Sequence, residues 1–140
     1  MSGSKPCLST LKYTLASAAC WCLMTLNTFS QELIFCEKVD GSGKPSNTST
    51  AFSISPKGGA VALLISSPLA FGNRQLTIDV FLLDKQRHET FENSIKMKVE
   101  PSWTWSVQSL TFYKPGTYVV YAYDEYGKLL GTRQVEILMP

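Results

Sequence analysis

Residues 113–127 read Tyr113-Lys-Pro-Gly-Thr-Tyr-Val-Val-Tyr-Ala-Tyr-Asp-Glu-Tyr-Gly127 and place one strand between two turns. Proline presets one backbone angle and glycine accepts conformations that other residues avoid, so Lys114-Pro-Gly116 indicates a turn. The β-branched and aromatic run that follows favours a strand. Alternate side chains of a strand point to opposite faces. The inward set is then Tyr118, Val120 and Ala122, and the outward set is Val119, Tyr121 and Tyr123.

The chain from residue 33 onward repeats this organisation, with short apolar runs separated by clusters of Gly, Pro, Asn and Asp. From Leu76 to Leu82, apolar residues alternate with polar ones, as in a strand with one face on a core. No segment shows the apolar spacing of a helix. The expected strands are 33–40, 50–54, 60–66, 76–82, 90–100, 102–113, 117–124 and 128–138.

Seven or eight strands at this spacing predict an all-β fold, an antiparallel β-sandwich with a single core in residues 31–140. A closed barrel is the alternative. Within 90–100, Ile95, Met97 and Val99 are expected to point inward. Within 102–113, the apolar parity changes between Val107 and Leu110, which predicts a β-bulge near residues 106–109.

Residues 113–127, followed by Val135-Glu-Ile137, resemble the last two strands of bacterial immunoglobulin-like, fibronectin type III-like and PKD-like surface domains. Such domains often combine Pro-Gly-Thr-Tyr, alternating apolar residues, an Asp-x-x-Gly turn and a final Val-x-Ile strand. The resemblance covers about 25 of the 140 residues. It implies an immunoglobulin-like β-sandwich, and it places Tyr118 at the tyrosine corner, where the hydroxyl bonds back to the backbone.

Residues 1–30 differ from the rest, because they hold Lys5 and Lys12, no acidic residue, and an uncharged run over 13–26. A weakly basic start, an apolar stretch and small residues after it are typical of a secretory signal peptide. The small Thr28 and Ser30 predict cleavage before Gln31. Alternatives are an uncleaved membrane anchor, a cytoplasmic apolar helix, or lipid attachment at Cys20.

Cleavage before Gln31 leaves Cys36 as the single cysteine of the mature chain. A lone thiol cannot form an internal disulfide, so Cys36 is either a small buried side chain on a strand or a reactive or intermolecular thiol. One cysteine and one histidine, His88, do not suffice for a structural zinc site, and no metal or cofactor is expected. Asp124 and Glu125 fit a turn, with calcium as the alternative.

The charge balance and the lack of a catalytic motif argue against nucleic-acid binding and enzymatic activity. Residues 31–140 carry 11 basic and 11 acidic side chains and no basic block, so we expect no nucleic-acid partner. No Gly-x-Ser-x-Gly motif is present. Asp79, Asp84 and Glu100 are conceivable acid–base partners, but exposed strand charges explain them more simply. We therefore expect no enzymatic activity.

Aromatic residues supply the candidate binding site. Trp and Tyr bury a large area at low entropic cost, and such a patch suits a protein partner or a sugar ring. The competing interpretation is that these rings fill the core and pave a sheet face. The candidate residues are Trp103, Trp105, Tyr121, Tyr123 and Tyr126.

These features predict an exported, periplasmic or extracellular, non-enzymatic binding or adaptor module of the cell envelope. It is expected to be a monomer that recognises a protein partner through a sheet face, an edge or its loops. The alternatives are a carbohydrate-binding module that uses exposed Trp and Tyr on a polysaccharide, and a structural envelope component. Membrane attachment is expected only through the presequence or lipidation. Loops 40–49 and 67–74 are the next candidates if the rings are structural.

Overall fold

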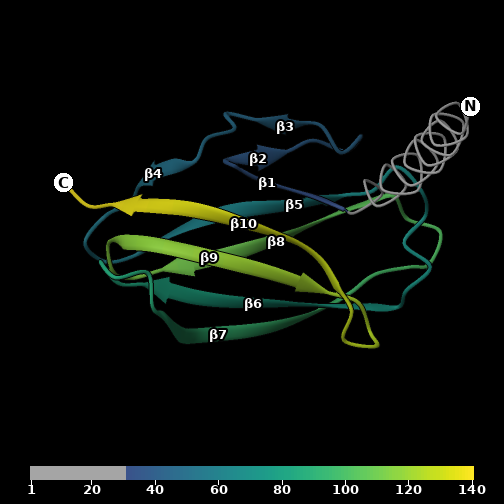
Figure 1. Ribbon diagram of the computed structural model, residues 1–140. Coiled ribbons are helices and arrows are strands. Elements are labelled where there is room, and N and C mark those ends of the chain that lie inside the picture. The colour runs from purple at the N-terminus through teal and green to yellow at the C-terminus, as the bar shows by residue number, and fades with distance from the viewer. Residues whose placement is uncertain (1–30) are drawn as a thin grey trace, which may run out of the picture. The chain divides into compact units, whose positions relative to one another are not determined.

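The computed structural model describes residues 31–140, in which every regular element is a strand (Figure 1). No helix in this part of the chain is long and apolar enough to cross a membrane. The predicted signal peptide and the proposed lipid site at Cys20 lie outside the described residues. The strands are β1 (Glu32–Cys36), β2 (Lys38–Val39), β3 (Pro45–Ser46), β4 (Ala51–Ser53), β5 (Gly59–Ser66), β6 (Gln75–Leu83), β7 (Glu89–Lys98), β8 (Trp105–Phe112), β9 (Gly116–Tyr123) and β10 (Leu129–Leu138).

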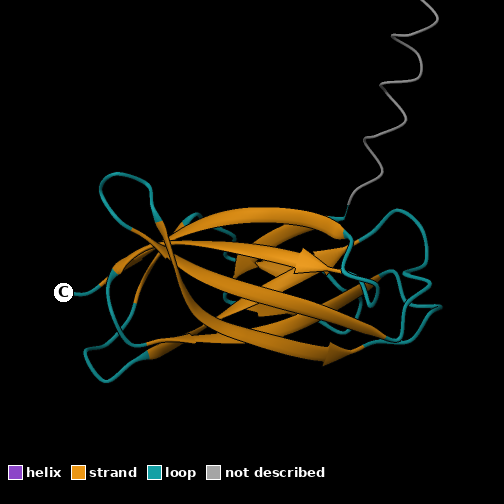
Figure 2. Cartoon of the chain, turned by 60° about the horizontal axis from the view of Figure 1, so that its bottom comes forward, coloured by secondary structure: helices purple, strands orange, loops and turns teal. Residues whose placement is uncertain are grey.

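Two sheets pack face to face, as Figure 2 shows, and this confirms the predicted all-β sandwich. One sheet has the order β1-β5-β8, and the other has the order β4-β10-β9-β6-β7. The pairs are antiparallel except for β4 and β10, which run parallel. The additional short strands arise because the expected strand 33–40 breaks at Glu37, after which β2 and β3 form a hairpin.

The core lies between the sheets and uses the parity that the sequence predicts. Leu76, Ile78 and Val80 of β6 point into it, and so do Met97 of β7 and Val120 of β9. The Tyr118 ring is buried, and its hydroxyl donates a hydrogen bond to the carbonyl of Lys114 over 2.9 Å. The tyrosine corner is therefore confirmed.

The bulge expected near residues 106–109 is absent, because β8 pairs with β5 in continuous register from Trp105 to Phe112. The apolar parity changes there for another reason: Trp105 and Val107 face away from the core, while Leu110 and Phe112 face into it. The register shifts that do occur lie between Val80 and Phe81 and in β10 before Gly131.

Candidate functional site

A row of four aromatic rings crosses the outer face of the five-stranded sheet. Phe91 comes from β7, Phe81 from β6, and Tyr121 and Tyr123 from β9. Phe81 meets Phe91 edge to face at a centroid distance of 5.7 Å and meets Tyr121 edge to face at 5.6 Å. The Tyr121 and Tyr123 rings stack at 6.5 Å. Phe91 is 58% exposed and the other three rings are half-buried, so the row is open to solvent at its β7 end.

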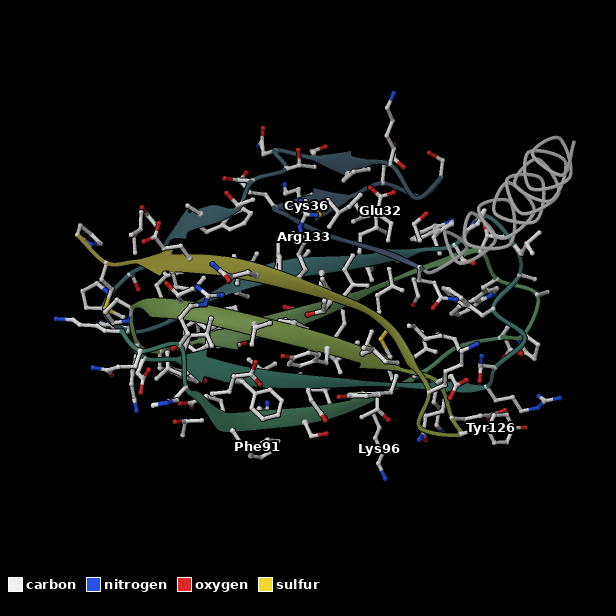
Figure 3. All side chains as sticks on the ribbon, viewed as in Figure 1. Glu32, Cys36, Phe91, Lys96, Tyr126 and Arg133 are labelled. Carbon is white, nitrogen blue, oxygen red and sulfur yellow. The ribbon has the colours of Figure 1, made fainter. Side chains whose placement is uncertain are left out.

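A β-bulge places Phe91 in this row. Phe91, Ile95 and Met97 lie even numbers of positions apart, so in a regular strand all three side chains would face the core. The register shift beside Val80 leaves Glu92 as an extra residue and sets Phe91 opposite Phe81 on the outer face. An inserted residue reverses the faces of all residues beyond it, so the bulge turns Phe91 outward (Figure 3).

Polar contacts hold the rings and the adjacent β6–β7 turn in place. The Tyr121 hydroxyl donates to Glu89 Oε2 over 2.5 Å, and this bond, together with the carboxylate charge, raises the pKa of Tyr121. Tyr121 therefore stays neutral at physiological pH. Arg87 Nη2 donates to Gln134 Oε1 on β10 over 3.2 Å, which ties the turn to a strand two places away. These contacts give the face a defined shape.

Trp105 does not join the tyrosines, because β8 belongs to the other sheet. Its indole faces the outer side of the three-stranded sheet, where the β2–β3 hairpin covers it. Gly43 lies so close that an added Cβ would be 2.7 Å from the indole ring. The expectation that Trp105 shares a surface with Tyr121 and Tyr123 is wrong, since consecutive strands β8 and β9 lie in different layers.

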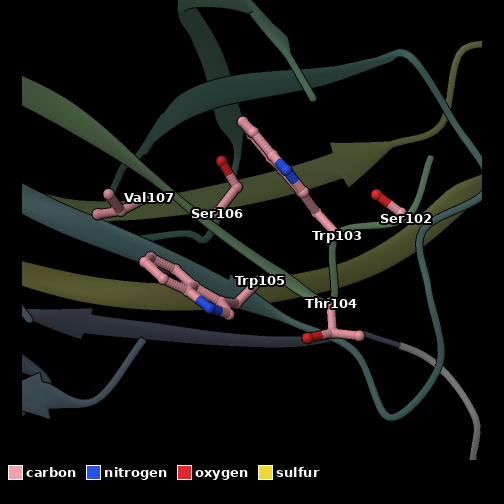
Figure 4. Close-up of a pocket in the computed structure, with 6 residues that line it drawn as sticks. All are labelled: Ser102, Trp103, Thr104, Trp105, Ser106 and Val107. Carbon is pink, nitrogen blue, oxygen red and sulfur yellow. The ribbon is translucent and has the colours of Figure 1, made fainter. Parts of the chain in front are cut away.

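Trp103 and Tyr126 lie at one end of the sandwich, in the β7–β8 and β9–β10 turns. Trp103 is 44% exposed and Tyr126 is 84% exposed. Figure 4 shows Trp103 and Trp105 on opposite sides of β8; with their neighbours they line a hollow of about 460 Å³. The Trp103 carbonyl accepts a hydrogen bond from Phe71 N over 2.8 Å, which joins its turn to the 67–74 loop. The five expected residues thus do not form one patch: Tyr121 and Tyr123 lie on the row, Trp103 and Trp105 line the hollow, and Tyr126 lies in the β9–β10 turn.

The groups considered for catalysis are dispersed. Asp84 accepts a hydrogen bond from His88 N in the β6–β7 turn, whereas Glu100 lies in the β7–β8 turn at the other end of the sandwich.

Cys36 is a free thiol with 0% exposure, as expected of a buried strand residue, and burial raises its pKa. Within residues 31–140, no cluster of three or more His, Cys, Asp or Glu side chains is placed to hold a metal ion.

Asp124 has the turn role that its Asp-x-x-Gly context predicts. Its Oδ1 accepts hydrogen bonds from the backbone amides of Tyr126 over 2.9 Å and Lys128 over 2.8 Å.

Sequence reasoning missed Phe81 and Phe91 as site residues. Phe81 had a usable signal, because it stands at the outward parity of a strand whose inward residues are apolar. Phe91 had none, because the bulge that turns it outward depends on pairing with β6.

One comparison with a solved structure, an immunoglobulin-like protein, supports the architecture. No protein-family model and no curated protein matches the sequence. An immunoglobulin-like protein from Pseudomonas aeruginosa matches the structure with a TM-score of 0.50 and 12% identity, over 76% of this chain and 91% of that one. The PmoD soluble domain from a Methylocystis species matches with a TM-score of 0.44 and 13% identity, over 79% and 90% of the two chains. A CARDB domain from Pyrococcus furiosus matches with a TM-score of 0.40 and 12% identity, over 80% and 97%.

At these identities the likeness concerns the fold alone. The strand order agrees with it, since β1-β5-β8 and β10-β9-β6 follow the A-B-E and G-F-C orders of immunoglobulin domains. The tyrosine corner at Tyr118 lies on β9, the strand that corresponds to F. Residues 31–140 therefore form an immunoglobulin-like β-sandwich.

Proposed function

We propose that the protein is an exported, non-enzymatic binding module of the cell envelope, and that it recognises a protein partner through the aromatic row. The observation that carries this proposal is the row itself, four rings from three strands on one sheet face with Phe91 exposed. Aromatic side chains dominate the energetics of protein interfaces because they bury a large area with few rotatable bonds. Export is supported by the composition of residues 1–30.

The ring geometry favours a protein over a polysaccharide. A sugar platform presents ring faces side by side in one plane, whereas the interplanar angles here are 77° for Phe81 and Phe91 and 85° for Phe81 and Tyr121. Edge-to-face packing leaves an uneven surface with grooves between rings. Such a surface suits the varied side chains of a protein.

Binding is tested by affinity capture from the native host, with the wild type beside Phe91→Ala and Tyr126→Ala. Both substitutions remove an exposed ring, but only Phe91 belongs to the row. We expect Phe91→Ala to lose the captured partner while Tyr126→Ala retains it. Equal capture by all three proteins contradicts the proposed face, and retention of a purified polysaccharide in place of a protein supports the carbohydrate-binding alternative.

Export is tested separately by intact-mass measurement of the protein made in its native host. We expect a mature form that begins at or near Gln31. A mass equal to the complete 140-residue chain contradicts cleavage. A diacylglyceryl-modified form that begins at Cys20 supports lipid anchoring in place of cleavage before Gln31.

A further inference from the structure

The β8 strand has an open edge. Its partner on one side is β5, and none of the strands in residues 31–140 pairs with its other side. In immunoglobulin constant-type domains a D strand lies beside strand E, the equivalent of β8. Here the strand that precedes β8 in the chain, β7, pairs with β6 in the opposite sheet. This is the C′ position of variable-type domains. The place beside β8 is therefore left free.

Backbone groups on this edge point away from the sheet at alternate residues. Ser67 N donates to Thr104 O over 2.8 Å, and this pair continues the β5–β8 register by one residue. Hydrogen-bonded and non-bonded pairs alternate in an antiparallel ladder, so odd-numbered residues of β8 turn their N–H and C=O outward. The Gln108 side chain donates to the Ser109 carbonyl over 3.1 Å, as expected for a carbonyl that β5 does not use.

The neighbouring edge, β7, carries the features that normally prevent strand addition. It has a bulge, Glu92 beside the inter-sheet gap, and Lys96 and Lys98 along its length. The β8 edge has none of these: residues 102–113 include no charged residue and no proline, and the register is unbroken over eight residues. An exposed, regular and uncharged edge is a template for another strand.

A hollow of about 200 Å³ lies between the two edges, directly beside β8. Its apolar lining comes from both sheets, namely Val80, Ile95, Leu110, Phe112 and Tyr118. A strand added beside β8 would direct alternate side chains into this gap. Main-chain hydrogen bonds then supply affinity, and a pocket for alternate side chains supplies selectivity.

We infer that the β8 edge binds an extended, uncharged segment of a partner protein, and that one large apolar side chain of this segment fills the hollow. An uncharged segment suits the edge because residues 102–113 offer no countercharge, and the two charged residues that line the hollow, Glu92 and Lys114, are of opposite sign. A second copy of the chain suits it less, because the core-side residues of its own β8, Leu110 and Phe112, are already buried in its own core and are not free to fill the hollow. This site is separate from the aromatic row.

The test uses the full chain and a synthetic probe, acetyl-Ser-Thr-Val-Thr-Phe-Thr-Val-Thr-Ser-amide. Control peptides replace the phenylalanine by aspartate or carry N-methyl groups on alternate amides, in both alternations. The protein variants are Ser109→Pro, which removes an outward N–H and no ladder bond, and Ser109→Ala, which keeps that N–H. Titration followed by backbone amide NMR locates the probe, and circular dichroism checks that each variant is folded.

We expect saturable binding that shifts the amides of residues 105–112, with at least about tenfold weaker binding for the aspartate peptide and for Ser109→Pro. Of the two N-methylated peptides, only the one whose methyl groups replace the N–H groups facing β8 should bind at least about tenfold more weakly, because the other keeps those N–H groups. Ser109→Ala and Phe91→Ala should bind as the wild type does, so failure of the aromatic row leaves this result unaffected. Equal affinity for the aspartate peptide, or shifts confined to another strand, overturns the inference. Dimerisation that Ser109→Pro abolishes, without probe binding, overturns it by assigning the edge to a second copy.

Discussion

The outer faces of the two sheets use aromatic residues in opposite ways. On the three-stranded sheet, the β2–β3 hairpin lies over Trp105, and Cys36 and Leu64 are buried although they point away from the main core. On the five-stranded sheet, no hairpin within residues 31–140 covers the row, and Phe91 remains exposed. An outward aromatic residue is therefore structural where a loop closes over it and available for binding where none does.

Among substitutions on the two outer faces, we expect the largest loss of stability at Trp105. Trp105→Ala removes the indole on which Gly43 packs and leaves a void between the hairpin and the sheet. We expect a loss of about 3 kcal/mol in the free energy of unfolding, at the lower end for a tryptophan because the ring is half-buried. Urea denaturation measures it. A change below about 0.5 kcal/mol would place Trp105 among ordinary surface residues.

A second prediction concerns the hairpin turn. Gly43 has φ of +87°, and an added Cβ would lie 2.7 Å from the Trp105 indole, so Gly43→Ala is strained in two ways. We expect a loss of about 2 kcal/mol. The control is Gly41→Ala in the same turn, where an added Cβ meets nothing within 4 Å.

Cys36 provides a local readout for the same variants. The buried thiol has a raised pKa, so less of it is thiolate at a given pH and alkylation of the wild type should be slow. Gly43→Ala should accelerate alkylation more than Gly41→Ala does, because a strained hairpin opens more often. Equal rates in both variants would show that opening of the hairpin does not limit access to Cys36.

A third substitution measures how much one buried hydrogen bond of the core contributes to the free energy of unfolding. Tyr118→Phe removes one hydrogen bond to the Lys114 carbonyl and keeps the ring, so we expect a loss of about 1 kcal/mol without a change of fold. Its effect should fall below that of Gly43→Ala. Unchanged stability in urea would mean that the tyrosine corner contributes nothing here.

The smallest effect on stability is expected on the open face. Phe91 is more than half exposed, so Phe91→Ala should change the free energy of unfolding by less than about 0.5 kcal/mol. The same substitution should abolish capture of the partner. A loss comparable to that of Trp105→Ala would remove the contrast between the two faces and assign the aromatic row to sheet packing.

Much of the fold could be predicted from residue order. The alternation in 76–82 and the Pro-Gly-Thr-Tyr turn identify strands, their inward faces and the tyrosine corner, because these features depend on neighbours along the chain. The candidate site was predicted only in part. Tyr121 and Tyr123 lie on the aromatic row, whereas Trp103, Trp105 and Tyr126 lie elsewhere.

The sequence by itself determined most of the strand segments, the inward faces of 76–82 and 117–123, and that the charge of residues 31–140 is balanced. Only the tertiary structure decided that β8 and β9 separate into two sheets, that a bulge turns Phe91 outward, and that Gly43 closes over Trp105. The physical reason is the range of the interactions. Strand propensity and parity arise within a few residues, whereas layer, register and cover depend on contacts between segments far apart in the chain.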